Sequence, residues 1–118
     1  MARLDIEVGD TAVGVTTTRV AGELDMHSAP ELRAKLGAVI AARPGGNVRL
    51  DLRALDFADS SGLSALIAMH KLAEASEGRL VLINPPRSVR RMLAITGLDT
   101  VLTVSEDSDP PAASEGAK

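Results

Sequence analysis

Residues 48–70 read VRLDLRALDFADSSGLSALIAMH and join a strand-like segment to a helix-like one. Residues 48–52 have the character of a β-strand. After the run Asp59-Ser60-Ser61-Gly62, four positions recur with the period of an amphipathic helix. These positions are Leu63, Leu66, Ile67 and His70. The stretch predicts a strand whose carboxyl end leads through a loop into a helix, and in open α/β sheets this edge is where ligands and partners gather.

Two further strands and a helix are predicted on the amino-terminal side. Residues 4–8 alternate apolar and acidic side chains, and residues 12–21 are rich in β-branched types, both typical of strands. Ser28 and Glu31 have the spacing of a capping box, with Pro30 in the first turn, so a helix is expected to begin there. Its apolar stripe consists of Leu32, Leu36, Val39 and Ile40.

The carboxyl-terminal side alternates strand and helix again. Residues 79–83 read as a buried strand, residues 87–96 as a short helix ended by Gly97, and residues 101–104 as a last strand. The order β-β-α-β-α-β-α-β predicts an α/β fold with a mixed sheet of about five strands and helices packed on it.

The chain length of 118 residues fits one domain. We expect this domain to span residues 1–105, followed by a disordered acidic tail, rich in Ser, Pro and Ala, over residues 106–118. No stretch has the pattern of a signal peptide or the length of a membrane span. These features predict a soluble, cytoplasmic protein that does not enter a membrane.

Composition excludes several classes of site. Phe57 is the only aromatic residue and the net charge is −3, whereas nucleic-acid sites need basic surfaces and often aromatic side chains. Direct binding of nucleic acid is therefore not expected. The absence of cysteine also removes disulfides, cysteine nucleophiles and thiolate metal sites.

Ser60 and Ser61 place two hydroxyl groups at the start of the predicted helix. The simplest interpretation is that Asp59 or one of the serines caps the helix. A catalytic role has little support, because a hydrolase elbow reads G-x-S-x-G. Ala58 and Asp59 occupy the positions of its first glycine for the two serines.

His27 and His70 are the available bases for such chemistry. His70 lies about 13 Å along the helix from Ser61, which is too far for a hydrogen bond. His27 stays possible through folding, although a lone loop histidine is usually solvated. Two histidines with no cysteine and no recognisable ligand spacing give no metal site. We predict no metal, no cofactor and no catalytic activity.

Two groups of charged residues stay open to interpretation. The acidic side chains near strand ends are interpreted as solvated loop carboxylates, with acid/base catalysis as the alternative. They are Glu23, Asp25, Asp51, Asp56 and Asp59. The basic cluster that opens the last helix is interpreted as a solvated face, with a contact surface as the alternative. It consists of Arg87, Arg90 and Arg91.

Three segments together carry a family resemblance. The first is V-A-G-E-L-D at residues 20–25, followed by the helix start at residues 28–32. The second spans residues 50–63 and ends in D-S-S-G-L, and the third spans residues 86–98 and ends in T-G-L. Over residues 4–105 the chain resembles the STAS domain family and, within it, the bacterial anti-sigma factor antagonists.

The resemblance implies a switch controlled by phosphorylation. The family's phosphoacceptor is usually the hydroxyl directly before the glycine, which is Ser61 here, with Ser60 as the alternative. Ala58 stands where methionine is frequent and Ser64 where glycine is frequent, so a third hydroxyl lies nearby. The implied partner-binding residues are Asp25, Asp59, Ser60, Ser61, Gly62 and Leu63.

By the same resemblance, the unphosphorylated protein binds an anti-sigma factor that is also a serine kinase, and this releases a sigma factor. Phosphorylation ends the binding, and a metal-dependent serine phosphatase restores it. Two alternatives stay open. One is the STAS subunit of a lipid/ABC transport complex, in which the serines only cap a helix. The other is a small hydrolase that uses Ser60 or Ser61.

Overall fold

The computed structural model describes residues 4–12 and 14–106. Over these residues the chain forms six strands, three α-helices and one short 3-10 helix. These are β1 (Leu4–Ala12), β2 (Val15–Leu24), α1 (Ala29–Ala42), β3 (Asn47–Asp51), β4 (Leu55–Ala58), α2 (Ser60–Ala75), β5 (Arg79–Ile83), α3 (Arg87–Thr96), η1 (Leu98–Thr100) and β6 (Thr103–Ser105). The predicted α/β class and mixed sheet are confirmed. The tail expected to be disordered lies outside the described residues from 107 onward.

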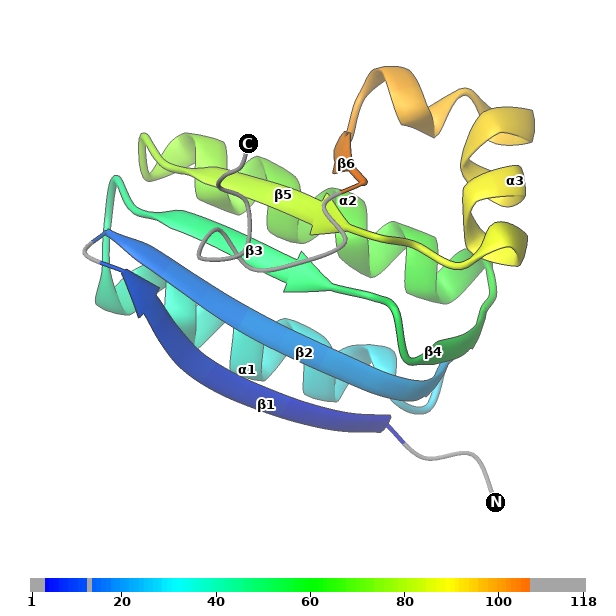
Figure 1. The fold of residues 1–118 in the computed structure, drawn as a ribbon, viewed down its shortest axis with the longest axis horizontal. Coiled ribbons are helices and arrows are strands. Elements are labelled where there is room, and N and C mark those ends of the chain that lie inside the picture. The colour runs from blue at the N-terminus through cyan, green and yellow to red at the C-terminus, as the bar shows by residue number, and fades with distance from the viewer. Residues whose placement is uncertain (1–3, 13, 107–118) are drawn as a thin grey trace, which may run out of the picture.

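The sheet has the strand order β1-β2-β3-β5-β6, and β4 pairs with β2 beyond the end of β3. β1 runs antiparallel to β2, and the other pairs are parallel. Helices α1 and α2 lie on one face of the sheet, and α3 stands beside β4 at one end of it (Figure 1). The parallel strands therefore bring their carboxyl ends to a common edge, close to the start of α2.

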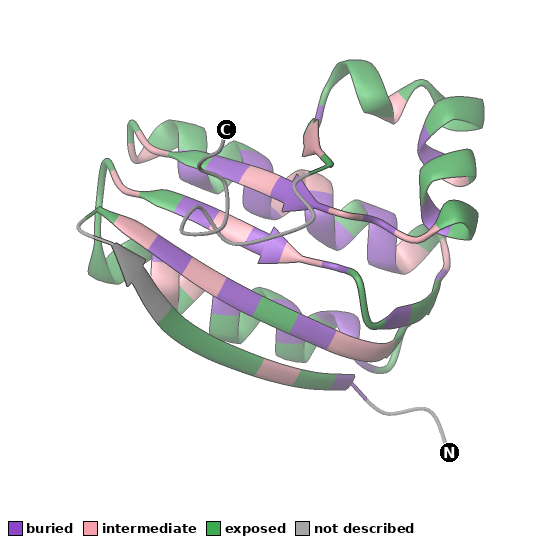
Figure 2. Ribbon diagram, viewed as in Figure 1, coloured by how far each residue is buried: buried purple, intermediate pink, exposed green. Residues whose placement is uncertain are grey.

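The core lies between the sheet and the two covering helices. Along β2, Thr16, Thr18 and Val20 are buried, whereas Arg19 on the other face is exposed (Figure 2). Leucine supplies most of the largest fully buried side chains, and burying one stabilises the fold by about 1.5–3 kcal/mol. These leucines are Leu24, Leu32, Leu36, Leu50, Leu52, Leu66, Leu80, Leu82 and Leu93. Within the described residues, no helix combines the length and apolar character that crossing a bilayer requires.

Strand β4 was not predicted, because its pattern is not that of an alternating strand. Leu55 and Ala58 are buried, and the two residues between them are exposed. The pairing of β4 with β2 also shifts register between Gly22 and Glu23. The segment expected to be a loop is thus a sixth strand, stabilised by its pairing with β2, and it delivers the chain directly to α2.

The predicted capping box at the start of α1 is wrong. Ser28 makes no side-chain hydrogen bond to the first turn of the helix. Its hydroxyl instead donates to the Glu23 carbonyl oxygen at 2.8 Å and accepts from the Asp25 backbone N–H at 3.0 Å. Glu31 lies 3.9 Å from the Lys35 ammonium group rather than on the cap. The Ser28 hydroxyl, which the sequence pattern assigns to the helix cap, is instead hydrogen-bonded to the backbone of the loop before the helix.

The last strand begins later than predicted. Gly97 ends α3 in the left-handed conformation, with φ of 77°, as its role as a C-cap requires. The chain then forms η1, and just after it the Leu102 N–H donates to the Leu98 carbonyl oxygen at 2.8 Å. Val101 is therefore in a turn, and β6 spans Thr103–Ser105.

Candidate functional site

The predicted site residues gather where the carboxyl ends of β2 and β4 meet the first turn of α2 (Figure 1). Asp25 lies in the loop after β2, and Ser60 and Ser61 are the first residues of α2. Gly62 and Leu63 are buried, the latter only 5% exposed. These two residues therefore pack beneath the surface of the site. Asp25, Asp59 and the two serines are accessible to a partner.

Asp59, and not a serine, caps helix α2. It has an extended backbone, with φ of −102° and ψ of −170°, and its Oδ1 accepts the Gly62 N–H at 3.0 Å. Within the part of the chain that the structure describes, neither the Ser60 nor the Ser61 hydroxyl makes a hydrogen bond. The cap is thus complete without them, and two hydroxyls are left available for chemistry.

The hydroxyls in the first turns of α2 differ in exposure. Ser60 is exposed, and Ser61 is half-buried against the sheet end. Ser64, one turn further along the helix, is also exposed. Because the N-terminus of a helix carries a partial positive charge that acts within its first turn, Ser60 and Ser61 suit a negatively charged group better than Ser64 does.

Asp25 organises the loop between β2 and α1. Its Oδ1 accepts the backbone N–H of His27 at 2.9 Å and that of Ser28 at 3.1 Å. The hydrogen bond from the Ser28 backbone is the main cause that lowers the pKa of the Asp25 carboxyl below 3.8, against an opposing effect of desolvation. The loop is therefore held by an ionised carboxylate.

This loop predicts a pH dependence of stability. A lowered carboxyl pKa in the folded state stabilises the fold above pH 3.8, and this contribution is lost as the pH falls through the folded-state pKa. Wild-type protein should be more stable than Asp25→Asn at pH 7, and the difference should shrink below about pH 4. Urea unfolding at both pH values measures it. Asp56→Asn, an exposed carboxylate without a hydrogen bond among the described residues, is the control. An equal loss there would contradict the assignment.

The end of β2, which leads into the Asp25 loop, packs directly against the start of α2. The Leu24 carbonyl oxygen accepts the Asp59 N–H at 3.1 Å. A Cβ atom at Gly62 would lie 2.7 Å from both the Cγ and the carbonyl oxygen of Leu24. The helix can approach β2 this closely only because residue 62 has no side chain.

The two histidines do not support hydrolysis. His70 is 7% exposed on α2, and its Nε2 lies 3.4 Å from Glu74. His27 is exposed in the loop after β2. Among the described residues no hydrogen bond joins either histidine to a serine of the site. Residues 4–12 and 14–106 also contain no group of three His, Cys, Asp or Glu side chains arranged to hold a metal ion.

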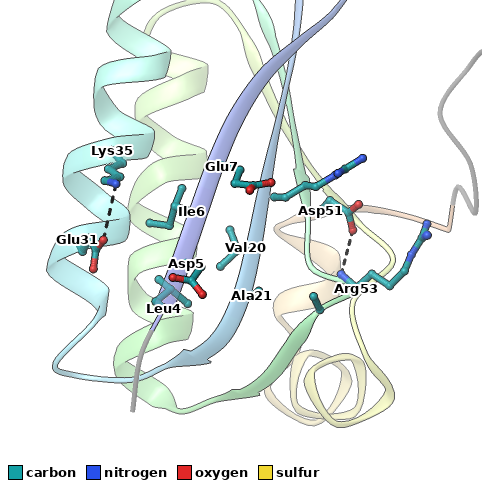
Figure 3. A pocket seen from close by; sticks show the side chains of 12 residues that line it. Leu4, Asp5, Ile6, Glu7, Val20, Ala21, Glu31, Lys35, Asp51 and Arg53 are labelled. Atoms are coloured by element: carbon teal, nitrogen blue, oxygen red, sulfur yellow. Dashed lines mark hydrogen bonds and ion pairs between the residues drawn. The ribbon is translucent and has the colours of Figure 1, made fainter. Parts of the chain in front are cut away.

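A surface hollow of about 740 Å³ lies away from these residues. It extends around edge strand β1, with Glu31 and Lys35 of α1 on one side and Asp51 and Arg53 on the other (Figure 3). It includes none of the residues predicted to bind a partner. Charged side chains of both signs line it, Glu31 and Asp51 with Lys35 and Arg53.

The sequence patterns missed two exposed apolar residues of the site, Met26 and Phe57. Met26 is 66% exposed next to Asp25, and Phe57 is 45% exposed two residues before Asp59. The signal available in the sequence was that the only aromatic residue stands in the D-S-S-G-L context.

Comparison with known proteins places the chain in a family. Residues 10–104 match the family model described as Mlab, STAS domain. The chain belongs to the STAS domain family. The anti-sigma-B factor antagonist of Bacillus subtilis (strain 168) is 36% identical over 90 residues, which cover 76% of this chain and 81% of the relative. The resemblance to STAS anti-sigma factor antagonists is confirmed.

Solved STAS structures share the fold. An anti-sigma factor antagonist from Mycobacterium paratuberculosis has 32% sequence identity and a TM-score of 0.79, with 91% of this chain and 89% of that chain covered. The Bacillus cell fate determinant SpoIIAA in its phosphorylated form has 26% identity and a TM-score of 0.66, with coverages of 87% and 93%. The STAS fold predicted from the sequence is confirmed.

Proposed function

We propose that this chain is an anti-sigma factor antagonist controlled by phosphorylation of Ser61. Its unphosphorylated form binds an anti-sigma factor serine kinase and so frees a sigma factor. The observation that carries the proposal is the completed cap of α2. Because Asp59 alone satisfies the Gly62 N–H, the Ser61 hydroxyl has no structural task among the described residues.

The first turn of α2 suits a phosphate without unfolding. A phosphoserine carries about −1.5 to −2 charges, and a helix N-terminus stabilises negative charge. The Asp59 carboxylate caps this turn, and Asp25 directly follows Leu24, whose carbonyl oxygen accepts the Asp59 N–H. Phosphorylation therefore leaves the fold intact and makes the binding surface strongly anionic.

Ser61 is preferred over the other hydroxyls by its place in the motif. It directly precedes Gly62, and Ser60 is the alternative. Ser61 is half-buried in the first turn of α2. A phosphate added there therefore changes the middle of the proposed partner-binding surface. The existence of a phosphorylated form of SpoIIAA, 26% identical to this chain, supports a phosphorylation site in this fold.

The proposal implies a cycle without catalysis by this chain. The kinase partner transfers phosphate from ATP to Ser61 and then releases the product, and a metal-dependent serine phosphatase returns it to the binding form. The names of its relatives support the anti-sigma factor as partner. We place this cycle in the cytoplasm, where sigma factors act.

A charge test of the switch compares Ser61→Asp with Ser61→Asn. Asp adds one negative charge at nearly the size of Asn, so it should weaken binding to the kinase at least tenfold, while Asn should change it less than threefold. The measurement is calorimetric titration against purified kinase-fold anti-sigma factors from the same genome, tested one at a time. Equal losses from both variants would mean that steric fit, rather than charge, controls release.

The alternative is a STAS subunit of a lipid/ABC transport complex that is never phosphorylated. It shares the fold, and the matching family model covers STAS domains under the name Mlab. Mass spectrometry of the chain after incubation with the kinase and ATP separates the two. One added phosphate on the peptide that contains Ser61 supports the switch, and its absence with every kinase tested favours the alternative.

A further inference from the structure

Phe57 is exposed at the site although the strand that carries it is firmly packed. Its neighbours Leu55 and Ala58 are 2% and 3% exposed, whereas Phe57 is 45% exposed. It faces Glu23 across the β2–β4 pairing. The only aromatic side chain of the protein is thus held outside an aliphatic core, on a fixed backbone.

Met26 is presented from an equally fixed loop. Its side chain is 66% exposed. The residues on either side are held by hydrogen bonds, because the Asp25 carboxylate accepts the N–H groups of His27 and Ser28 at 2.9 and 3.1 Å. The Ala29 N–H also donates to the Asp25 carbonyl oxygen at 2.8 Å. Little backbone entropy remains to be lost when a partner covers this loop, so the entropic cost falls mainly on ordering the Met26 side chain.

Met26 and Phe57 lie on the two segments that meet the first turn of α2, one after β2 and one within β4. A specific interface buries about 800 Å² on each protein, which corresponds to a disc of about 16 Å radius. Phe57 is four residues from Ser61, at most about 14 Å. Met26 is two residues, or about 7 Å, from Leu24, whose Cγ lies 2.7 Å from the Cβ position of Gly62. An interface of this size that includes Ser61 can therefore extend to both side chains.

We propose that Met26 and Phe57 are the apolar anchors that hold the anti-sigma factor serine kinase on this chain, and this inference rests on the proposed function. A few large side chains near the centre of an interface, aromatic ones prominent among them, supply much of its binding energy, and methionine adapts its shape to the surface it meets. The kinase surface that fits them is an apolar pocket. Once it closes, water is excluded around Ser61, so a phosphate there must be buried without its hydration.

Truncation of each anchor tests the proposal. Met26→Ala and Phe57→Ala should each raise the dissociation constant for the purified kinase at least tenfold in calorimetric titration. Met26→Leu and Phe57→Leu should restore most of the affinity. Val8→Ala is the matched control, since Val8 is 52% exposed and pairs with Thr18, six residues or about 20 Å along β2 from Leu24. It should change the affinity less than twofold.

The outcomes separate this inference from the proposed function. If wild type binds the kinase and gains phosphate on Ser61, but both alanine variants bind within twofold of it, the anchors are wrong and the switch stands. If wild type binds none of the kinases, the switch and the anchors both fail. Thermal unfolding of each variant shows whether it folds, and if Phe57→Ala is unfolded, Met26→Ala decides alone.

Discussion

Ser61→Ala should take up less than a tenth of the phosphate that wild type accepts from the kinase and ATP, and should still bind the kinase. Asp59 provides the cap of α2, so losing the hydroxyl should change the free energy of unfolding by no more than about 0.5 kcal/mol. A variant that binds and cannot be released acts as a permanently active antagonist. Radiolabelled phosphate uptake measures the phosphorylation, and calorimetric titration measures the affinity for the kinase.

Ser60→Ala and Ser64→Ala are the matched controls for this variant. Both side chains are exposed on the same helix. Each control should keep phosphate uptake close to that of wild type, because the hydroxyl before Gly62 is intact. Undiminished uptake in Ser61→Ala, with loss in one of the controls, would move the phosphoacceptor to that residue and overturn the assignment.

Gly62→Ala should destabilise the fold by about 2–3 kcal/mol, in the upper part of the range of about 1–3 kcal/mol that an extra carbon in a well-packed region typically costs. The new Cβ would lie 2.7 Å from the Leu24 carbonyl oxygen, which already accepts the Asp59 N–H. Relieving that contact requires α2 to move away from β2, which would break the hydrogen bond. The gain in helix propensity from glycine to alanine, about 1 kcal/mol, does not offset this.

Gly37→Ala shows what the same substitution does where space exists. Gly37 lies within α1, and a Cβ there would meet only the Leu72 Cδ2, at an ordinary 3.8 Å. This variant should be stabilised by about 0.5–1 kcal/mol. Urea unfolding of both variants gives the comparison, and a Gly62→Ala protein as stable as wild type would show that the close approach of α2 to β2 is not required.

Local patterns are enough to predict most elements of this fold. The helical period after Gly62, the strand character of residues 48–52 and 79–83 and the glycine at position 97 each act over a few neighbouring residues. They predict the α/β order and the helix that starts at the D-S-S-G-L run. Such signals are readable because they depend on backbone geometry within one element.

The formation of the short strand β4 and the hydrogen bonds of the Ser28 hydroxyl depend instead on groups outside the local sequence pattern. β4 exists because Glu23 and Leu24 pair with Phe57 and Ala58, more than thirty positions away in the chain. Ser28 leaves the predicted capping box because the Glu23 carbonyl oxygen and the Asp25 N–H compete for its hydroxyl. Neither outcome follows from local spacing, since each is decided by which groups the folded chain brings within hydrogen-bond distance.

The candidate site divides in the same way. The run Asp59-Ser60-Ser61-Gly62 could be located from sequence as a helix start, because capping residues and glycine at such a boundary have local causes. Only the tertiary structure decided that Asp59 is the cap, that Gly62 is needed against Leu24, and that Phe57 stays exposed. The physical reason is that capping geometry, close approach and exposure are properties of the packed β2–β4–α2 junction, whose parts are separated along the chain.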